Sequence, residues 1–211
     1  MGGSDSKEFS APAAAGEDII AYSDTTDYAA NLEMAKDFYE RQKPTLSAEP
    51  LEKIDTPNEK TIEELSQLLD VPAEKLAKTI MFMADGELVA VVTTGDFEVN
   101  DVKVQNFLQA DTLELAEEGQ VKALIGASFG SLGPVKLPEN VRLLVDERAA
   151  DLVNFAAGAN EDGKHYLNIN WQRDVQLTEE NIGDFRTARE GDVAVDGHGH
   201  LVFTKGIEIG D

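Results

Sequence analysis

The stretch KTIMFMADGELVAVVTTGD, residues 78–96, contains two runs of apolar and β-branched residues on either side of Asp85-Gly86. An Asp-Gly pair between two such runs is a strong signal for the two-residue turn of a β-hairpin. We therefore expect two antiparallel strands here. Lys78 stands where a short helical turn passes into the first strand.

Helical and strand patterns alternate along the rest of the chain. Residues 1–20 are rich in Gly, Ala and Ser, which predicts a loose segment. Because hairpins outnumber βαβ crossovers, we expect an α+β fold whose mixed, largely antiparallel, curved sheet has flanking helices. Helices are expected over 24–42, 61–70, 100–109 and 117–126, and strands over 141–146, 163–171 and on both sides of a glycine turn within 192–210.

Composition and charge limit what the chain can do. The net charge of −23 repels nucleic acid when averaged over the surface, so only local binding of a nucleic-acid end is compatible with it. The absence of cysteine excludes disulfides, zinc–thiolate sites and thiol nucleophiles. No apolar run is long enough to span a bilayer, and we expect a soluble, cytoplasmic protein without membrane partners.

Three stretches contain residues that are suited to chemistry. The loop Gly130-Ser131-Leu132-Gly133-Pro134 can expose consecutive N–H groups to an oxyanion, or it is an ordinary surface turn. Lys78 can hold a phosphate at the mouth of a cleft, or it is a solvated lysine near a helix end. Asp146 ends a strand, where carboxylates line sites but also cap helices.

The three histidines fall in two different settings. If residues 164–171 alternate as a strand, His165 lies on the same face as three apolar residues, Leu167, Ile169 and Trp171. It is then either a buried histidine of the core or a histidine that lines a pocket. The segment DGHGH, residues 196–200, imitates a metal-ligand cluster, but its Asp-Gly pair favours an exposed turn. We expect no metal site.

A set of longer stretches forms a more specific pattern from about residue 23 to the end of the chain. These stretches are SDTTDYAANLEMA, DTPNEKTIEEL, EKLAKTIMF, TGDFEVNDVK, FGSLGP, VNFAAGANEDGKHYLNINW and GDVAVDGHGHLVFTKGIEIG. In this order they resemble the editing insertion of bacterial-type prolyl-tRNA synthetases, within the YbaK-like family of aminoacyl-tRNA deacylases. The resemblance implies an editing domain at 45–190, with border segments of a parent catalytic domain at 1–44 and 191–211.

This resemblance implies hydrolysis of mischarged alanyl-tRNA(Pro), with prolyl-tRNA(Pro) spared. A pocket built for proline rejects a residue smaller by one methylene only by about 1–3 kcal/mol, so a second sieve is needed. The implied partners are the tRNA acceptor end and the parent synthetase in cis. No cofactor is implied for editing, since ATP serves only the catalytic domain. A non-catalytic module that binds the acceptor end, and a free-standing deacylase, are the alternatives.

The resemblance also implies roles for particular residues. Lys78 matches an essential lysine, and His165 matches a histidine that protects prolyl-tRNA. Thr56 and Asp146 match pocket positions, and residues 130–134 match the GxxxP loop, whose amides we expect to hold the ester carbonyl while a ribose hydroxyl of the tRNA helps activate water. Many relatives have RGDHELN where this chain has TGDFEVN, so an arginine and a histidine are lost and any tRNA contact made by that arginine is in doubt here.

Overall fold

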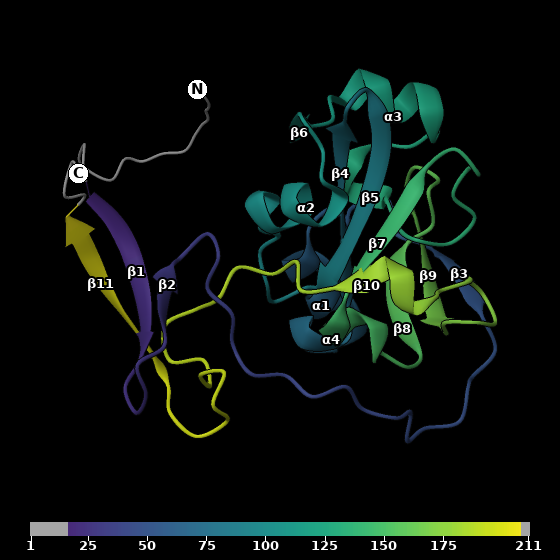
Figure 1. Ribbon diagram of the computed structural model, residues 1–211. Helices are drawn as coiled ribbons and strands as arrows, with labels where there is room; N and C mark the ends of the chain where they lie inside the picture. The colour runs from purple at the N-terminus through teal and green to yellow at the C-terminus, as the bar shows by residue number, and fades with distance from the viewer. Residues whose placement is uncertain (1–16, 208–211) are drawn as a thin grey trace. The chain divides into compact units, whose positions relative to one another are not determined.

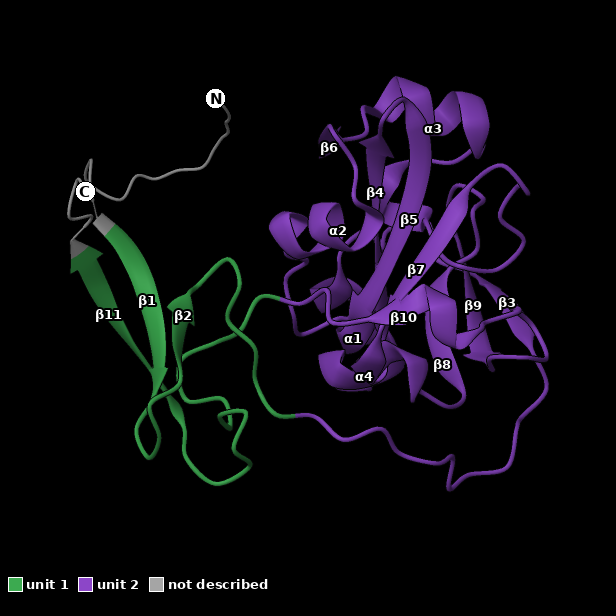
Figure 2. Ribbon diagram, viewed as in Figure 1, with its two compact units in different colours: residues 1–38, 187–211 green, residues 39–186 purple. Residues whose placement is uncertain are grey.

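The computed structural model describes residues 17–207 (Figure 1). Two compact units divide the chain at 38/39 and 186/187, and each is described by itself (Figure 2). The family resemblance places its limits at 44/45 and 190/191, and the origin of the outer segments in a parent enzyme stays a prediction. Residues 1–16 of the expected loose segment lie outside the described residues, whereas residues 17–20 belong to a strand.

The larger unit, residues 39–186, is built on the predicted hairpin. Its two strands pair antiparallel along their whole length, and the turn residues Asp85 and Gly86 have φ values of 49° and 83°. Both residues are left-handed, as the tight turn requires. The hairpin belongs to a five-stranded sheet of order β10-β7-β5-β4-β6. The strands are β4 Ala77–Ala84, β5 Glu87–Thr94, β6 Leu113–Leu115, β7 Arg142–Asp146 and β10 Ile182–Gly183.

The helices of this unit begin at capping residues that are visible in the sequence. Thr61 and Glu64 form a capping box, and Asn100 accepts a hydrogen bond from the backbone N–H of Lys103. The predicted helices at 61–70, 100–109 and 117–126 are therefore confirmed, each shorter by a few residues. The helices are α1 Ile62–Leu69, α2 Asp101–Leu108, α3 Glu118–Leu124 and α4 Glu147–Ala150, with 3₁₀ turns η1 Ala73–Lys75, η2 Phe129–Ser131 and η3 Glu179–Asn181.

A second sheet, of order β3-β9-β8, shares its core with the first. Its strands are β3 Glu52–Asp55, β8 Phe155–Gly158 and β9 Lys164–Ile169. Leu76, just before β4, bridges to Ala156 of β8, so the two sheets meet there. One buried cluster contains Phe155 and Ile169 of this sheet together with Val92 and Val145 of the other.

The smaller unit corrects the prediction of a helix over 24–42. Its sheet has the order β11-β1-β2, with β1 Glu17–Ser23, β2 Ala29–Asn31 and β11 Leu201–Ile207. Ser23 and Thr25, whose hydroxyls stand where the predicted helix would begin, donate hydrogen bonds to the Asp196 carboxylate. Of the two strands predicted within 192–210, the one after the glycine turn is present as β11, and it pairs with β1. The one before the turn is not a strand, because Val193 and Ala194 form only isolated bridges, to His200 and Asp37.

The fold class is confirmed as α+β with largely antiparallel sheets. Among the described strands, only the β5–β7 and β7–β10 pairs are parallel. The strands are divided among separate sheets, because the hairpin pairs with β7 and the segment around His165 pairs with β3 and β8. Between residues 17 and 207, no helix is long and apolar enough to cross a membrane.

Candidate active site

A cavity of about 620 Å³ lies between α1, the first half of β4, the η2 loop and the ends of β8 and β9. Lys78, His165, Gly130 and Leu132 line it, so the structure brings together residues that lie up to 87 positions apart in the chain. The other lining residues are Lys60, Thr61, Ile62, Glu63, Leu65, Ser66, Ala73, Ala77, Thr79, Ile80, Gly95, Glu98, Phe129 and Gly158.

Lys78 is the second residue of β4 and lies largely covered at the cavity wall. Its side chain is 19% exposed, and its Nζ is 3.3 Å from Oε1 of Glu98, a carboxylate whose side chain is 85% exposed. An exposed ion pair of this kind contributes little stability. Its partner is therefore easily exchanged, and the ammonium is available to an anionic ligand in the cavity.

His165 is held from behind by Thr56. Its Nδ1 is hydrogen-bonded to the Thr56 hydroxyl, and both side chains are buried. The Thr56 N–H also donates to the carbonyl of Gly163, two residues before the histidine. Because Nδ1 is occupied, Nε2 is the ring nitrogen that remains for the cavity. Thr56 thus fixes the ring from outside the cavity lining.

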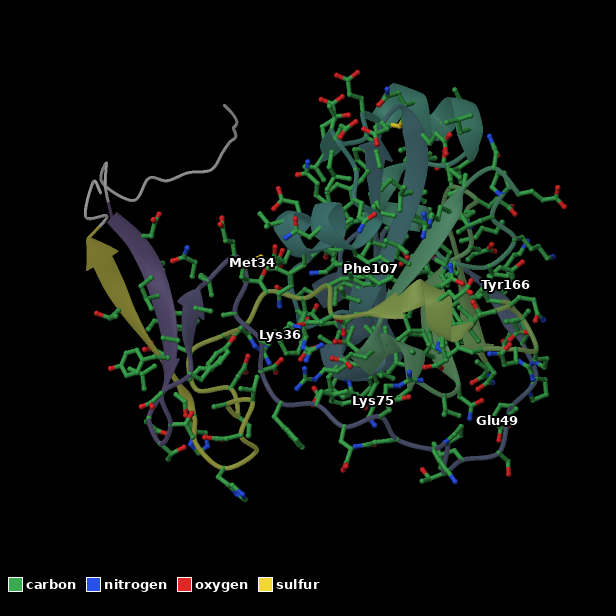
Figure 3. All side chains as sticks on the ribbon, in the orientation of Figure 1. Met34, Lys36, Glu49, Lys75, Phe107 and Tyr166 are labelled. Atoms are coloured by element: carbon green, nitrogen blue, oxygen red, sulfur yellow. The ribbon has the colours of Figure 1, made fainter. Side chains whose placement is uncertain are left out.

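The expected face of the His165 strand is only partly right. His165 lines the cavity, and Leu167 packs with Leu65 and Leu76. Asn168, however, has a φ of 61°, and this left-handed residue breaks the alternation of the strand. Ile169 therefore joins Tyr166, labelled in Figure 3, in the buried cluster that both sheets share.

Burial lowers the pKa of His165 below its ordinary value. The unfolded chain takes up a proton that the folded chain resists, so the free energy of unfolding falls as pH drops below about 6.5. We expect His165→Gln to lose less stability than wild type between pH 7 and pH 5, as measured by urea unfolding. His198→Gln, which removes a histidine from an exposed turn, is the matched control for the loss of an imidazole. Equal losses in wild type and His165→Gln would contradict this account.

The loop from Gly130 to Pro134 is clamped by Asn160. The Asn160 side chain accepts from the N–H of Gly133 at 2.9 Å and donates to the carbonyls of Gly133 and Val135 at 2.9 and 2.8 Å. Its own N–H donates to the carbonyl of Ser131 at 2.8 Å. The loop backbone also lies directly on Gly158, where a Cβ on Gly133 would come within 1.9 Å of the Gly158 carbonyl oxygen.

Only part of this loop faces the cavity. The N–H groups of Ser131 and Gly133 donate to Ser128 and Asn160, and Pro134 has no N–H. The Ser131 hydroxyl accepts from the N–H of Gly163. Gly130 and Leu132 are the loop residues that line the cavity. These two are therefore the loop residues whose N–H groups can be offered to a ligand in this cavity.

Asp146 lies elsewhere, at the end of β7. It is 1% exposed, and both of its carboxylate oxygens are 3.2 Å from Nη1 of Arg186. It accepts hydrogen bonds from the N–H groups of Phe185 and Arg148, the second as cap of α4. Burial raises its pKa, while Arg186 opposes that rise. Asp146 therefore caps α4 and is not among the residues that line the cavity, and its contact with substrate stays a prediction.

Sequence reasoning missed three residues at the site. Glu98 and Phe129 belong to the family-matching stretches TGDFEVNDVK and FGSLGP, but no role was expected for either residue. Asn160 did have a signal, because asparagine tolerates left-handed backbone and pairs with main-chain groups, and here its φ is 57°. In the DGHGH segment, Asp196 accepts from the N–H groups of His198 and Gly199, which is a turn.

The family model described as aminoacyl-tRNA editing domain matches residues 56–175, a range that begins at Thr56 and includes Lys78, the GxxxP loop and His165. The chain therefore belongs to the aminoacyl-tRNA editing domain family.

Within that family, the chain is similar to a segment of proline–tRNA ligases. It is 74% identical over 210 residues to the proline–tRNA ligase of Leuconostoc mesenteroides and 51% identical to that of Lactiplantibacillus plantarum. All of this chain is covered, but it spans only 37% of each relative.

Two solved structures share the fold. One is a hypothetical protein with a TM-score of 0.54 and 21% identity, matched over 65% of this chain and 91% of its own. The other is described as a candidate trans-editing enzyme for prolyl-tRNA synthetase, with a TM-score of 0.53, 15% identity and coverage of 65% and 87%. At these identities the likeness concerns the fold alone.

Proposed function

We propose that this chain hydrolyses the ester of mischarged alanyl-tRNA(Pro), spares prolyl-tRNA(Pro), and works in cis within a prolyl-tRNA synthetase. The observation that carries the proposal is the meeting of Lys78, His165 and Gly130 at one cavity inside the family-matched segment. The proline–tRNA ligases that resemble the whole chain support the choice of tRNA.

The proposed mechanism relies on orientation and on backbone donors. Lys78 holds a phosphate or ribose oxygen of the terminal nucleotide in place of Glu98, which fixes the ester against the loop. The N–H groups of Gly130 and Leu132 face the carbonyl oxygen as negative charge develops. A ribose hydroxyl of the tRNA assists the attacking water. The two acids of the lining, Glu63 and Glu98, are the carboxylates available to the substrate's α-ammonium.

One set of assays tests the proposed function. Alanyl-, prolyl- and cysteinyl-tRNA(Pro) are incubated with the full chain, and the loss of the ester bond is followed with time. We expect rapid loss of the alanyl ester and slow loss of the other two. Binding of tRNA without any hydrolysis would instead favour a non-catalytic acceptor-end module, and overturn the proposal.

The proposed role of His165 predicts that its removal increases hydrolysis of the correctly charged prolyl-tRNA(Pro). Its ring, fixed by Thr56, forms part of the wall that limits the size of the aminoacyl side chain. His165→Ala removes that wall, and we expect hydrolysis of prolyl-tRNA(Pro) to rise by about tenfold, which corresponds to about 1.4 kcal/mol of discrimination. The measurement is prolyl-tRNA deacylation, with His198→Ala as the matched control. If proline stays fully protected, His165 is not the sieve.

A further inference from the structure

Phe129 is an aromatic side chain that the proposed mechanism leaves unused. It begins the η2 turn beside Gly130, lines the cavity, and is nevertheless 48% exposed. Its neighbours are well anchored. The N–H of Ser128 donates to Asp162 at 2.7 Å, and the N–H of Ser131 donates to the Ser128 carbonyl at 3.0 Å. The ring is thus presented to solvent at the cavity by an ordered turn.

Positive charge is placed beside this turn. Lys60 also lines the cavity, and its Cβ would lie 2.7 Å from a Cβ added to Gly130, so the two backbones are in direct contact. Hydrogen bonding from the Ser128 N–H lowers the pKa of Asp162, and the charges of Lys122 and Lys60 lower it further. The Asp162 carboxylate, which accepts the hydrogen bond from this turn, is thus within the electrostatic influence of two lysines.

An exposed aromatic ring with nearby lysines is the combination that binds unpaired nucleotides. Bases stack on the ring, and the ammonium groups attract the backbone phosphates. Stacking does not depend on net charge, so it gives affinity to a chain of charge −23 that repels nucleic acid overall. We infer that the Phe129 ring is the stacking platform for the terminal adenine base of the substrate's acceptor end, with Lys60 beside the adjoining phosphate.

This inference rests on the proposed function, because the ester in the cavity determines which base lies at its mouth. The aminoacyl group is attached to the ribose of the terminal nucleotide. When that ester reaches Gly130, the base on the same ribose is the one within reach of the neighbouring Phe129.

The test compares two small esters with the full chain. One is 2′(3′)-O-alanyl adenosine, and the other is the alanyl ester of methyl riboside, which has no base. We expect wild type to hydrolyse the adenosine ester with a kcat/KM about tenfold higher, as one stacked base supplies. Phe129→Ala should remove this preference by slowing only the adenosine ester, while Phe129→Tyr keeps it. Phe38→Ala, an aromatic of similar exposure at 43% in the smaller unit, should keep the wild-type ratio.

Other outcomes separate this inference from the proposed function. If Phe129→Ala slows both esters equally, Phe129 belongs to the aminoacyl wall and the inference is overturned; an unchanged ratio overturns it as well. If wild type hydrolyses neither ester, the proposed function is in question, and the stacking site is then tested by binding. Phe129→Trp fluorescence should be quenched by adenosine monophosphate and not by ribose 5-phosphate. Equal quenching by the two, or none, overturns the inference.

Discussion

Lys78→Ala is expected to lower kcat/KM for deacylation of alanyl-tRNA(Pro) by about 100-fold or more, because positioning and charge are lost together. The ammonium that fixes the terminal nucleotide disappears. Glu98, its partner at 3.3 Å, is left as an unpaired carboxylate that repels incoming phosphates. The measurement is ester loss under single-turnover and multiple-turnover conditions. Equal rates for variant and wild type would remove Lys78 from the mechanism.

A second lysine, Lys75, provides a control for the Lys78→Ala variant. Lys75, labelled in Figure 3, is exposed on η1 three residues earlier and lines a separate hollow of about 460 Å³. Lys75→Ala should change deacylation by less than about twofold. The Glu98 side chain of the ion pair is largely exposed, so the pair contributes little stability. Lys78→Ala should therefore leave the free energy of unfolding within about 0.5 kcal/mol of wild type. A large loss of stability would mean that the lost activity has a structural cause.

Gly133→Ala is expected to disable the loop, although Gly133 itself does not line the cavity. The new Cβ would lie 1.9 Å from the Gly158 carbonyl oxygen, a distance that backbone atoms do not tolerate, so the loop must move. The hydrogen bonds to Asn160 are lost with that movement. We expect the free energy of unfolding to fall by about 1–3 kcal/mol, as for other overpacked sites. Deacylation should fall by about 100-fold, since Gly130 and Leu132 shift with the loop.

Gly119→Ala is the matched control for a glycine-to-alanine change. Gly119 lies inside α3, and an added Cβ there meets nothing within 4 Å. Alanine should raise the free energy of unfolding by about 0.5–1 kcal/mol, because it restricts the unfolded chain. Activity should stay at the wild-type level. Full deacylation activity in Gly133→Ala would show that close packing of the loop on Gly158 is not needed for catalysis.

The sequence by itself determined the elements whose signals are local. Asp85-Gly86 defines a hairpin, Thr61 and Asn100 cap helices, and the motif set places the chain in its family, because each of these depends on a few adjacent residues. Where local residues fit more than one kind of element, the predicted element was wrong. The segment after Ser23 has helical spacing, but the hydroxyls of Ser23 and Thr25 are hydrogen-bonded to Asp196, which is 173 residues away from Ser23.

Only the tertiary structure decided which candidate residues meet. His165 acquires its fixed ring from Thr56, 109 residues earlier, and Asp146 is bound by Arg186, 40 residues later. Lys78 and the GxxxP loop face one cavity because β4 and β8 come together at the Leu76–Ala156 bridge. Such partners are chosen by pairing and burial between distant segments, which bury polar groups only where each finds a hydrogen bond. A carboxylate such as Asp146 looks the same in sequence whether its partner is a substrate or an arginine.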